Sequence, residues 1–142
     1  MELPNAVGPY EHLARFLTQT NHFSPQSNSV KPRVFEPPDD LRLSVFRVDG
    51  LDRQEVWAIG QTNVISRMPP PRKTLYGMAD ILAFLFEGRN LHVDPDNNPP
   101  RHANITGWPE AKSERKLIAQ ELAVEATLVL RSASDRTDIP LV

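Results

Sequence analysis

The clearest alternation of apolar and polar residues lies at residues 41–48, LRLSVFRV, and it predicts a β-strand with one buried face. Arg47 falls on the apolar side of this alternation, so we expect it to be buried or to lie at the end of the sheet. The apolar side holds Leu41, Leu43 and Val45, and the other side holds Arg42, Ser44 and Phe46.

Two further segments alternate, NLHVD at 90–94 and HANITG at 102–107. The connection between them, PDNNPPR, consists almost entirely of residues that favour turns. We therefore predict two strands that pair as a hairpin.

Three segments carry the spacing of amphipathic helices. Residues 52–60 are the best defined, because Asp52 and Glu55 have the spacing of a capping box. Residues 9–20 show apolar positions three and four apart, and so does a longer segment at 109–131. Each of the three is predicted to pack one apolar side on a sheet.

The segments between residues 74 and 87 are harder to assign. TLYGMA at 74–79 predicts a short strand. DILAFLFE at 80–87 fits a buried helix or a buried strand, which periodicity cannot separate. Asp80 as a cap and Gly88 as a stop favour the helix.

These elements predict an α+β fold, a small and mainly antiparallel sheet packed by about three to four helices. The length of 142 residues fits a single domain spanning 1–142. Within it, the proline-rich stretches 21–40 and 61–73 are predicted loops, and 132–142 a loose tail.

Composition narrows the classes of protein. A net charge of −2 without a basic run makes nucleic acid an unlikely partner. The chain has no cysteine, which excludes disulfides and thiolate metal sites. No apolar run reaches the roughly 20 residues that span a membrane. The amino-terminal segment does not read as a signal peptide, so we expect a cytoplasmic protein that does not engage membranes.

The candidate functional side chains lie mainly on the predicted hairpin. If its apolar residues are buried, the opposite face carries two imidazoles, a carboxylate, an amide and a hydroxyl. Three interpretations stay open: a solvated sheet face, a binding or acid–base face, and a metal site made of two histidines and an aspartate. The last lacks a fourth ligand, and no metal or other cofactor is predicted. The five polar residues of this hairpin face are His92, Asp94, His102, Asn104 and Thr106.

Two arginines extend this candidate site. A guanidinium can grip a phosphate or carboxylate with paired hydrogen bonds. Arg101 lies in the hairpin connection, where a solvated charge is the simpler explanation. Arg47 could instead form a structural ion pair, for which either Asp49 or Asp80 is the expected partner.

At LSVFR (43–47), YGMAD (76–80) and RHANITGWP (101–109) the chain resembles a group of small uncharacterised bacterial proteins. The resemblance spans about residues 9–130 and implies a bacterial protein but no activity. LSVFRVDGLDRQEVWAIG is also similar in outline to ADP-ribosyltransferase-like folds, in which a strand ending in Arg or His precedes a helix. The chain departs from those folds, since it offers no Ser-Thr-Ser strand and no matching catalytic Glu.

Two functions are compatible with these patterns. The first is a bacterial accessory domain that binds a partner protein, because no catalytic motif is present. The alternative is a small enzyme or ligand-binding domain acting on a nucleotide or other phosphorylated ligand. In that alternative His102 and His92 transfer protons, while Arg101, Asn104, Arg47 and Asp94 bind the ligand.

Overall fold

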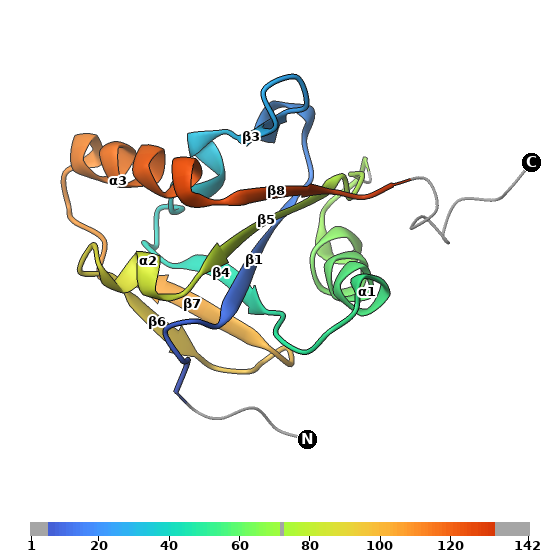
Figure 1. Cartoon of the computed structure of the whole chain (residues 1–142), viewed down its shortest axis with the longest axis horizontal. Coiled ribbons are helices and arrows are strands. Elements are labelled where there is room, and N and C mark those ends of the chain that lie inside the picture. The colour runs from blue at the N-terminus through green and yellow to red at the C-terminus, as the bar shows by residue number, and fades with distance from the viewer. Residues whose placement is uncertain (1–5, 72, 133–142) are drawn as a thin grey trace, which may run out of the picture.

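The computed structural model describes residues 6–71 and 73–132, and its centre is a six-stranded antiparallel sheet (Figure 1). The strand order β6-β7-β4-β1-β5-β8 places β1 near the middle and β6 and β8 at the edges. The mainly antiparallel sheet is therefore confirmed. Its strands are β1 (His12–Leu17), β4 (Leu43–Arg47), β5 (Gly77–Leu82), β6 (His92–Pro95), β7 (His102–Thr106) and β8 (Thr127–Leu130).

The described residues also form three α-helices and several shorter elements. The helices are α1 (Arg53–Asn63), α2 (Phe84–Glu87) and α3 (Lys112–Glu125). The predicted loop 21–40 contains a two-stranded sheet of β2 (Phe23–Ser24) and β3 (Ser29–Val30), between the 3-10 turns η1 (Thr20–His22) and η2 (Pro32–Phe35). Nowhere in the described parts of the chain is a helix long and apolar enough to cross a membrane.

The amino terminus of α1 forms as its sequence predicts. Asp52 accepts a hydrogen bond from the Glu55 backbone N–H at 2.8 Å, and the Glu55 carboxylate accepts one from the Asp52 N–H at 3.2 Å. The helix runs past residue 60, however, and η3 (Ile65–Arg67) follows it, so 61–73 is not wholly a loop. Gly60 is buried inside the helix, where a Cβ would lie 2.8 Å from the ring of Phe16.

The helix predicted at 9–20 is wrong, because the chain forms β1 there. β1 is a central strand buried on both faces: Leu13 and Leu17 lie in one core, and Ala14 and Phe16 in the other. A strand with two buried faces has no polar alternation, so its apolar residues mimic helical spacing.

Two other element boundaries differ from the prediction. The long last helix ends at Glu125, and the chain continues as the edge strand β8. β5 extends through Asp80 to Leu82, so Asp80 is a strand residue and not a helix cap, and its carboxylate lies 2.8 Å from Nδ1 of His12. Gly88 does end α2. Residues 133–142 of the predicted tail lie outside the described residues.

The sheet has two differently covered faces, with α3 and α1 on opposite sides of it (Figure 1). One face packs against α2, η2 and α3 in a continuous apolar core. The other packs against α1 and η3 through a smaller cluster that includes Trp57 and Met78. Because this cluster covers only part of the second face, the strands farther along it keep polar side chains.

Candidate functional site

The predicted hairpin forms, with His92 opposite Thr106 and Asp94 opposite Asn104. The five polar residues therefore share a face, as expected from the alternation. Thr106 donates a hydrogen bond to the Asp94 carboxylate at 2.5 Å. Asn104 lies opposite Ser44, because β7 pairs on its other side with β4.

The two histidines of this face are not neighbours. His92 lies opposite Thr106, which is four residues along β7 from His102, or about 13 Å at the usual strand rise. His92 is exposed on the edge strand, whereas the His102 side chain is 13% exposed. Among the residues that the structure describes, no group of three His, Cys, Asp or Glu side chains is placed to hold a metal ion.

The arginines of the predicted site have structural partners. Arg47 is buried, and its guanidinium binds Glu11 through Nε at 2.5 Å and Nη2 at 3.0 Å. Its partner is thus Glu11 and neither Asp49 nor Asp80, since β1 brings Glu11 beside the end of β4. Arg101 donates to the backbone carbonyls of Arg47 and Asp49, both at 3.1 Å, which fastens the hairpin connection to the end of β4.

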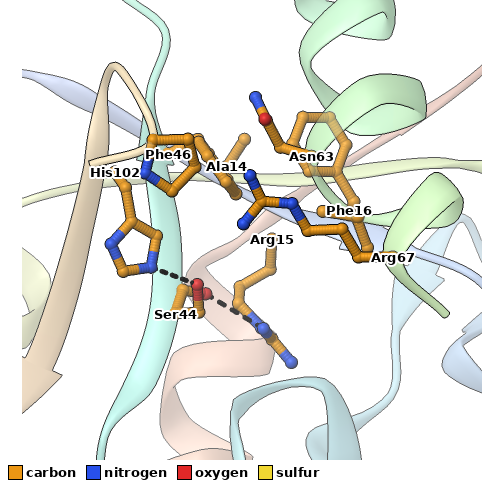
Figure 2. Close-up of a pocket in the computed structure, with 10 residues that line it drawn as sticks. Ala14, Arg15, Phe16, Ser44, Phe46, Asn63, Arg67 and His102 are labelled. Carbon is orange, nitrogen blue, oxygen red and sulfur yellow. Dashed lines mark hydrogen bonds between the residues drawn. The ribbon is translucent and has the colours of Figure 1, made fainter. Parts of the chain in front are cut away.

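A cavity of about 260 Å³ lies on the α1 side of the sheet, which we call the His102 pocket. Strands β1, β4 and β7 supply one wall, and the end of α1 with η3 supplies the other (Figure 2). Its polar lining comes from Arg15, Ser44, Asn63, Arg67 and His102.

His102 links two further polar residues in this pocket. Its Nε2 lies 2.5 Å from Ser44 Oγ, and its Nδ1 lies 2.7 Å from Asp96 Oδ1. Ser44 is opposite Asn104, so His102 is its diagonal neighbour on the same face, within reach of a long side chain. The ring of Phe46 packs edge-on against the imidazole, with 5.3 Å between centroids.

Asp96 is fixed in the hairpin connection, where its two oxygens accept different hydrogen bonds. The backbone N–H of Asn98 donates to Oδ1 at 3.1 Å, and the Asn104 amide donates to Oδ2 at 3.3 Å. Desolvation raises the pKa of Asp96, but the hydrogen bonds from His102 and Asn98 and the charge of His102 outweigh it. The pKa is therefore below its usual value. Asp96 consequently stays an anion beside His102.

Arg15 occupies the place where β1 and β4 part. β1 pairs with β5 along its whole length, but with β4 only at Leu13–Arg47 and Ala14–Phe46. Beyond these pairs the Arg15 side chain substitutes for the backbone ladder. Its Nη1 donates to the Ser44 carbonyl and its Nε to the Val34 carbonyl, both at 2.9 Å.

The positive charge of Arg15 has no counterion in the described part of the chain. Its only hydrogen bonds there go to carbonyl oxygens, and no carboxylate forms an ion pair with it. Burial lowers the pKa of Arg15 to about 10, which leaves it charged at neutral pH.

Arg67 adds a second positive charge to the pocket. It is exposed on η3, and its guanidinium points into the pocket towards Ser44 and His102 (Figure 2). No carboxylate within the described ranges 6–71 and 73–132 forms an ion pair with Arg67. Arg15 and Arg67 therefore make this pocket electropositive.

Of the predicted site residues, only His102 lines the pocket. Asn104 is linked to it indirectly, because the Asn104 amide and the His102 imidazole both hydrogen-bond to Asp96. Sequence reasoning missed Ser44, Asp96, Arg15 and Arg67. Ser44 was on the polar side of the best predicted strand, which is the one signal that pointed to it. The other three fell in a predicted turn, helix and loop, and nothing in those patterns places them beside His102.

Comparison with known proteins adds no assignment: no family model, no curated protein and no solved structure matches this chain.

Proposed function

We propose that the chain is a small enzyme or ligand-binding domain that takes a phosphorylated or similarly anionic small molecule into the His102 pocket. The observation that carries this proposal is that two arginines line the pocket, Arg67 pointing into it and Arg15 partly buried in its wall, and neither has a counterion among the described residues. Removing a cation from water costs several kcal/mol unless an anion offsets the loss. Within the described residues, Glu11 forms an ion pair with Arg47, but no carboxylate forms one with Arg15.

The chemistry of the pocket favours a phosphate or carboxylate. The Arg67 guanidinium points into it and can donate paired hydrogen bonds to a planar or tetrahedral oxyanion. Arg15 lies in the wall with its guanidinium bonded to the Val34 and Ser44 carbonyls, and it adds positive charge. The volume of about 260 Å³ is just below the roughly 300–1,000 Å³ of drug-sized ligand sites. The ligand is thus a small molecule or the phosphorylated end of a larger one, such as a nucleotide.

The roles of the predicted residues change accordingly. His102 keeps the role of proton acceptor, and Asn104 acts indirectly by holding Asp96. His92 and Asp94 lie farther along the hairpin, and Arg47 and Arg101 are engaged in structural contacts. None of these four takes part in the proposed binding.

Calorimetric titration with inorganic phosphate and a panel of phosphorylated small molecules tests this proposal. We expect at least one compound to bind, and Arg67→Gln to weaken it about 10-fold or more, because a charge-assisted hydrogen bond contributes about 1.5–3 kcal/mol. Affinity should also fall as salt rises.

Arg53→Gln is the matched control, since Arg53 is an exposed arginine at the start of α1 and does not line the pocket. Its affinity should equal that of the wild type. The proposal fails if none of these compounds binds at millimolar concentration, or if Arg53→Gln and Arg67→Gln weaken binding equally.

A protein-interaction role stays a second candidate. It is favoured by two apolar side chains on the outer side of α3, Leu117 and Val124, which are 60% and 83% exposed. Cross-linking of the chain to proteins from its own cell, compared with the Leu117→Lys/Val124→Lys variant, tests it. Loss of a defined cross-linked partner in the variant supports this role, and an unchanged pattern contradicts it.

A further inference from the structure

The His102 pocket holds an uninterrupted hydrogen-bonded chain from a carboxylate through an imidazole to a hydroxyl. Asp96 Oδ1 lies 2.7 Å from His102 Nδ1, and His102 Nε2 lies 2.5 Å from Ser44 Oγ. The three residues come from the hairpin connection, β7 and β4, and Ser44 and His102 are 58 positions apart in sequence. This is the order of groups that activates a serine as a nucleophile.

The surroundings of His102 fix its tautomer and its orientation. The Asp96 carboxylate can only accept, so Nδ1 carries the proton that it receives. Nε2 of the neutral ring is then the acceptor for the Ser44 hydroxyl. Phe46 limits the rotation of the ring, and the Asn104 amide holds the second oxygen of Asp96.

The hydroxyl end of this chain opens onto the cavity. Ser44 and His102 both line it, and the Arg67 guanidinium points towards them across the pocket (Figure 2). A substrate carbonyl next to Ser44 Oγ would thus meet a donor that can stabilise the negative charge developing on its oxygen. A purely structural hydrogen-bond chain requires neither the cavity nor this opposing cation.

We propose that Ser44 is a catalytic nucleophile that accepts an acyl group from a small ester carrying an anionic group. His102 Nε2 takes the proton of Ser44 as Oγ attacks the carbonyl carbon, and Arg67 binds the resulting oxyanion. When the carbon–oxygen bond to the leaving group breaks, His102 returns that proton to the departing alcohol. Water then adds to the acyl-serine by the same proton transfers, releasing the acid and restoring Ser44. Asp96 is a positioning residue.

The anionic group on the ester rests on the proposed function, but the nucleophile does not. A neutral alkyl fluorophosphonate therefore tests Ser44 independently. It phosphonylates an activated serine and expels fluoride, and intact-mass analysis detects the addition. We expect one adduct per chain, located at Ser44 by peptide mapping and absent from Ser44→Ala. Ser113→Ala, an exposed serine on α3, should react like the wild type.

Asp96→Asn separates positioning from folding. Asp96 is an exposed residue, so the variant should fold, and its circular dichroism spectrum should match that of the wild type. The labelling rate should fall about 10²-fold or more, because the amide no longer holds the tautomer and orientation of His102. An unchanged labelling rate in Asp96→Asn overturns the positioning role.

The failures of the two proposals are distinguishable. Phosphate binding without labelling of Ser44 overturns the nucleophile and leaves the proposed function standing. Labelling of Ser44 without binding of any anion overturns the proposed function and leaves the nucleophile standing. Hydrolysis of p-nitrophenyl acetate and mono-p-nitrophenyl succinate completes the test. Arg67→Gln should lower kcat/KM more for the anionic ester, and an equal loss on both esters contradicts the anionic substrate class.

Discussion

On one face of the sheet, β1, β4, β5 and β7 present mainly apolar residues to α2, η2 and α3, whereas on the other face the same strands present both apolar and polar ones. The first face is closed by two helices and a 3-10 turn, and its side chains stabilise the fold. The second is covered only in part by α1 and η3, which leaves the His102 pocket beside them. The difference shows that a candidate site formed where the covering layer of the sheet is incomplete.

The largest effect should come from the closed face. Phe35 is fully buried there and packs edge-on against Phe86. Phe35→Ala should lower the free energy of unfolding by about 3–5 kcal/mol, through lost burial and an unfilled cavity. Ser44→Ala on the pocket face should cost less than about 1.5 kcal/mol. Urea unfolding measures both, and equal losses would contradict the contrast between the faces.

Loss of the ion pair at the end of β4 should have the next largest effect. Glu11→Gln removes the carboxylate charge that faces Arg47, whose side chain is 1% exposed, so a buried ion pair is broken. We expect a loss of about 2–3 kcal/mol in chemical denaturation. Adding Arg47→Met should recover part of it. A double variant less stable than Glu11→Gln alone would show that Arg47 stabilises the fold without Glu11.

A smaller effect concerns His22, which is half-buried and close enough to Arg15 to be affected by its charge. Burial and the charges of Arg15 and Arg33 lower the pKa of His22 to about 4, and its Nδ1 accepts a hydrogen bond from the Thr18 N–H. An unfolded histidine binds its proton near pH 6.5, so the unfolded chain takes up protons first as pH falls. Stability should thus decrease from about pH 6.5 to 4.

His22→Gln should remove this pH dependence, which we expect to amount to about 1–2 kcal/mol because solvent near the ring screens the two guanidiniums. Thermal melts across the pH range measure the difference between variant and wild type. Parallel curves for the two proteins would show that His22 does not titrate with a lowered pKa.

The smallest effect is expected at the exposed end of the hairpin. Thr106→Val removes the hydrogen bond to Asp94, an exposed residue, and valine favours a strand as well as threonine does. We expect a change below about 1 kcal/mol in urea unfolding and no change in phosphate affinity. A large loss of affinity would extend the binding site along the hairpin, away from the His102 pocket.

The sequence predicted those elements whose signals are local. The capping box of Asp52 and Glu55 defines the start of α1 through hydrogen bonds within four residues. The alternation in β4, β6 and β7 identifies strands and assigns His102 and Asn104 to one polar face. The α+β class and the place of Arg47 on the apolar side of its strand follow from the same patterns, and the structure shows that Arg47 is buried there.

Tertiary structure decided the elements and contacts that depend on distant residues. β1 is a strand because β4 and β5 pair with it on both sides, and its own residues also fit a helix. The end of the last predicted helix became β8 because an edge of β5 was open to it. Neither pairing is encoded by a local period.

The same distinction between local and tertiary signals applies to the residues of the candidate site. The sequence by itself placed His102 on the polar face of a strand and Ser44 on the polar face of another. Only the pairing of β4 with β7 made them diagonal neighbours, and only the parting of β1 and β4 brought Arg15 to the same pocket. The two-residue period of a strand determines the face of the sheet on which a side chain lies. The order of the strands, which is set by packing of the whole chain, determines which side chains become its neighbours.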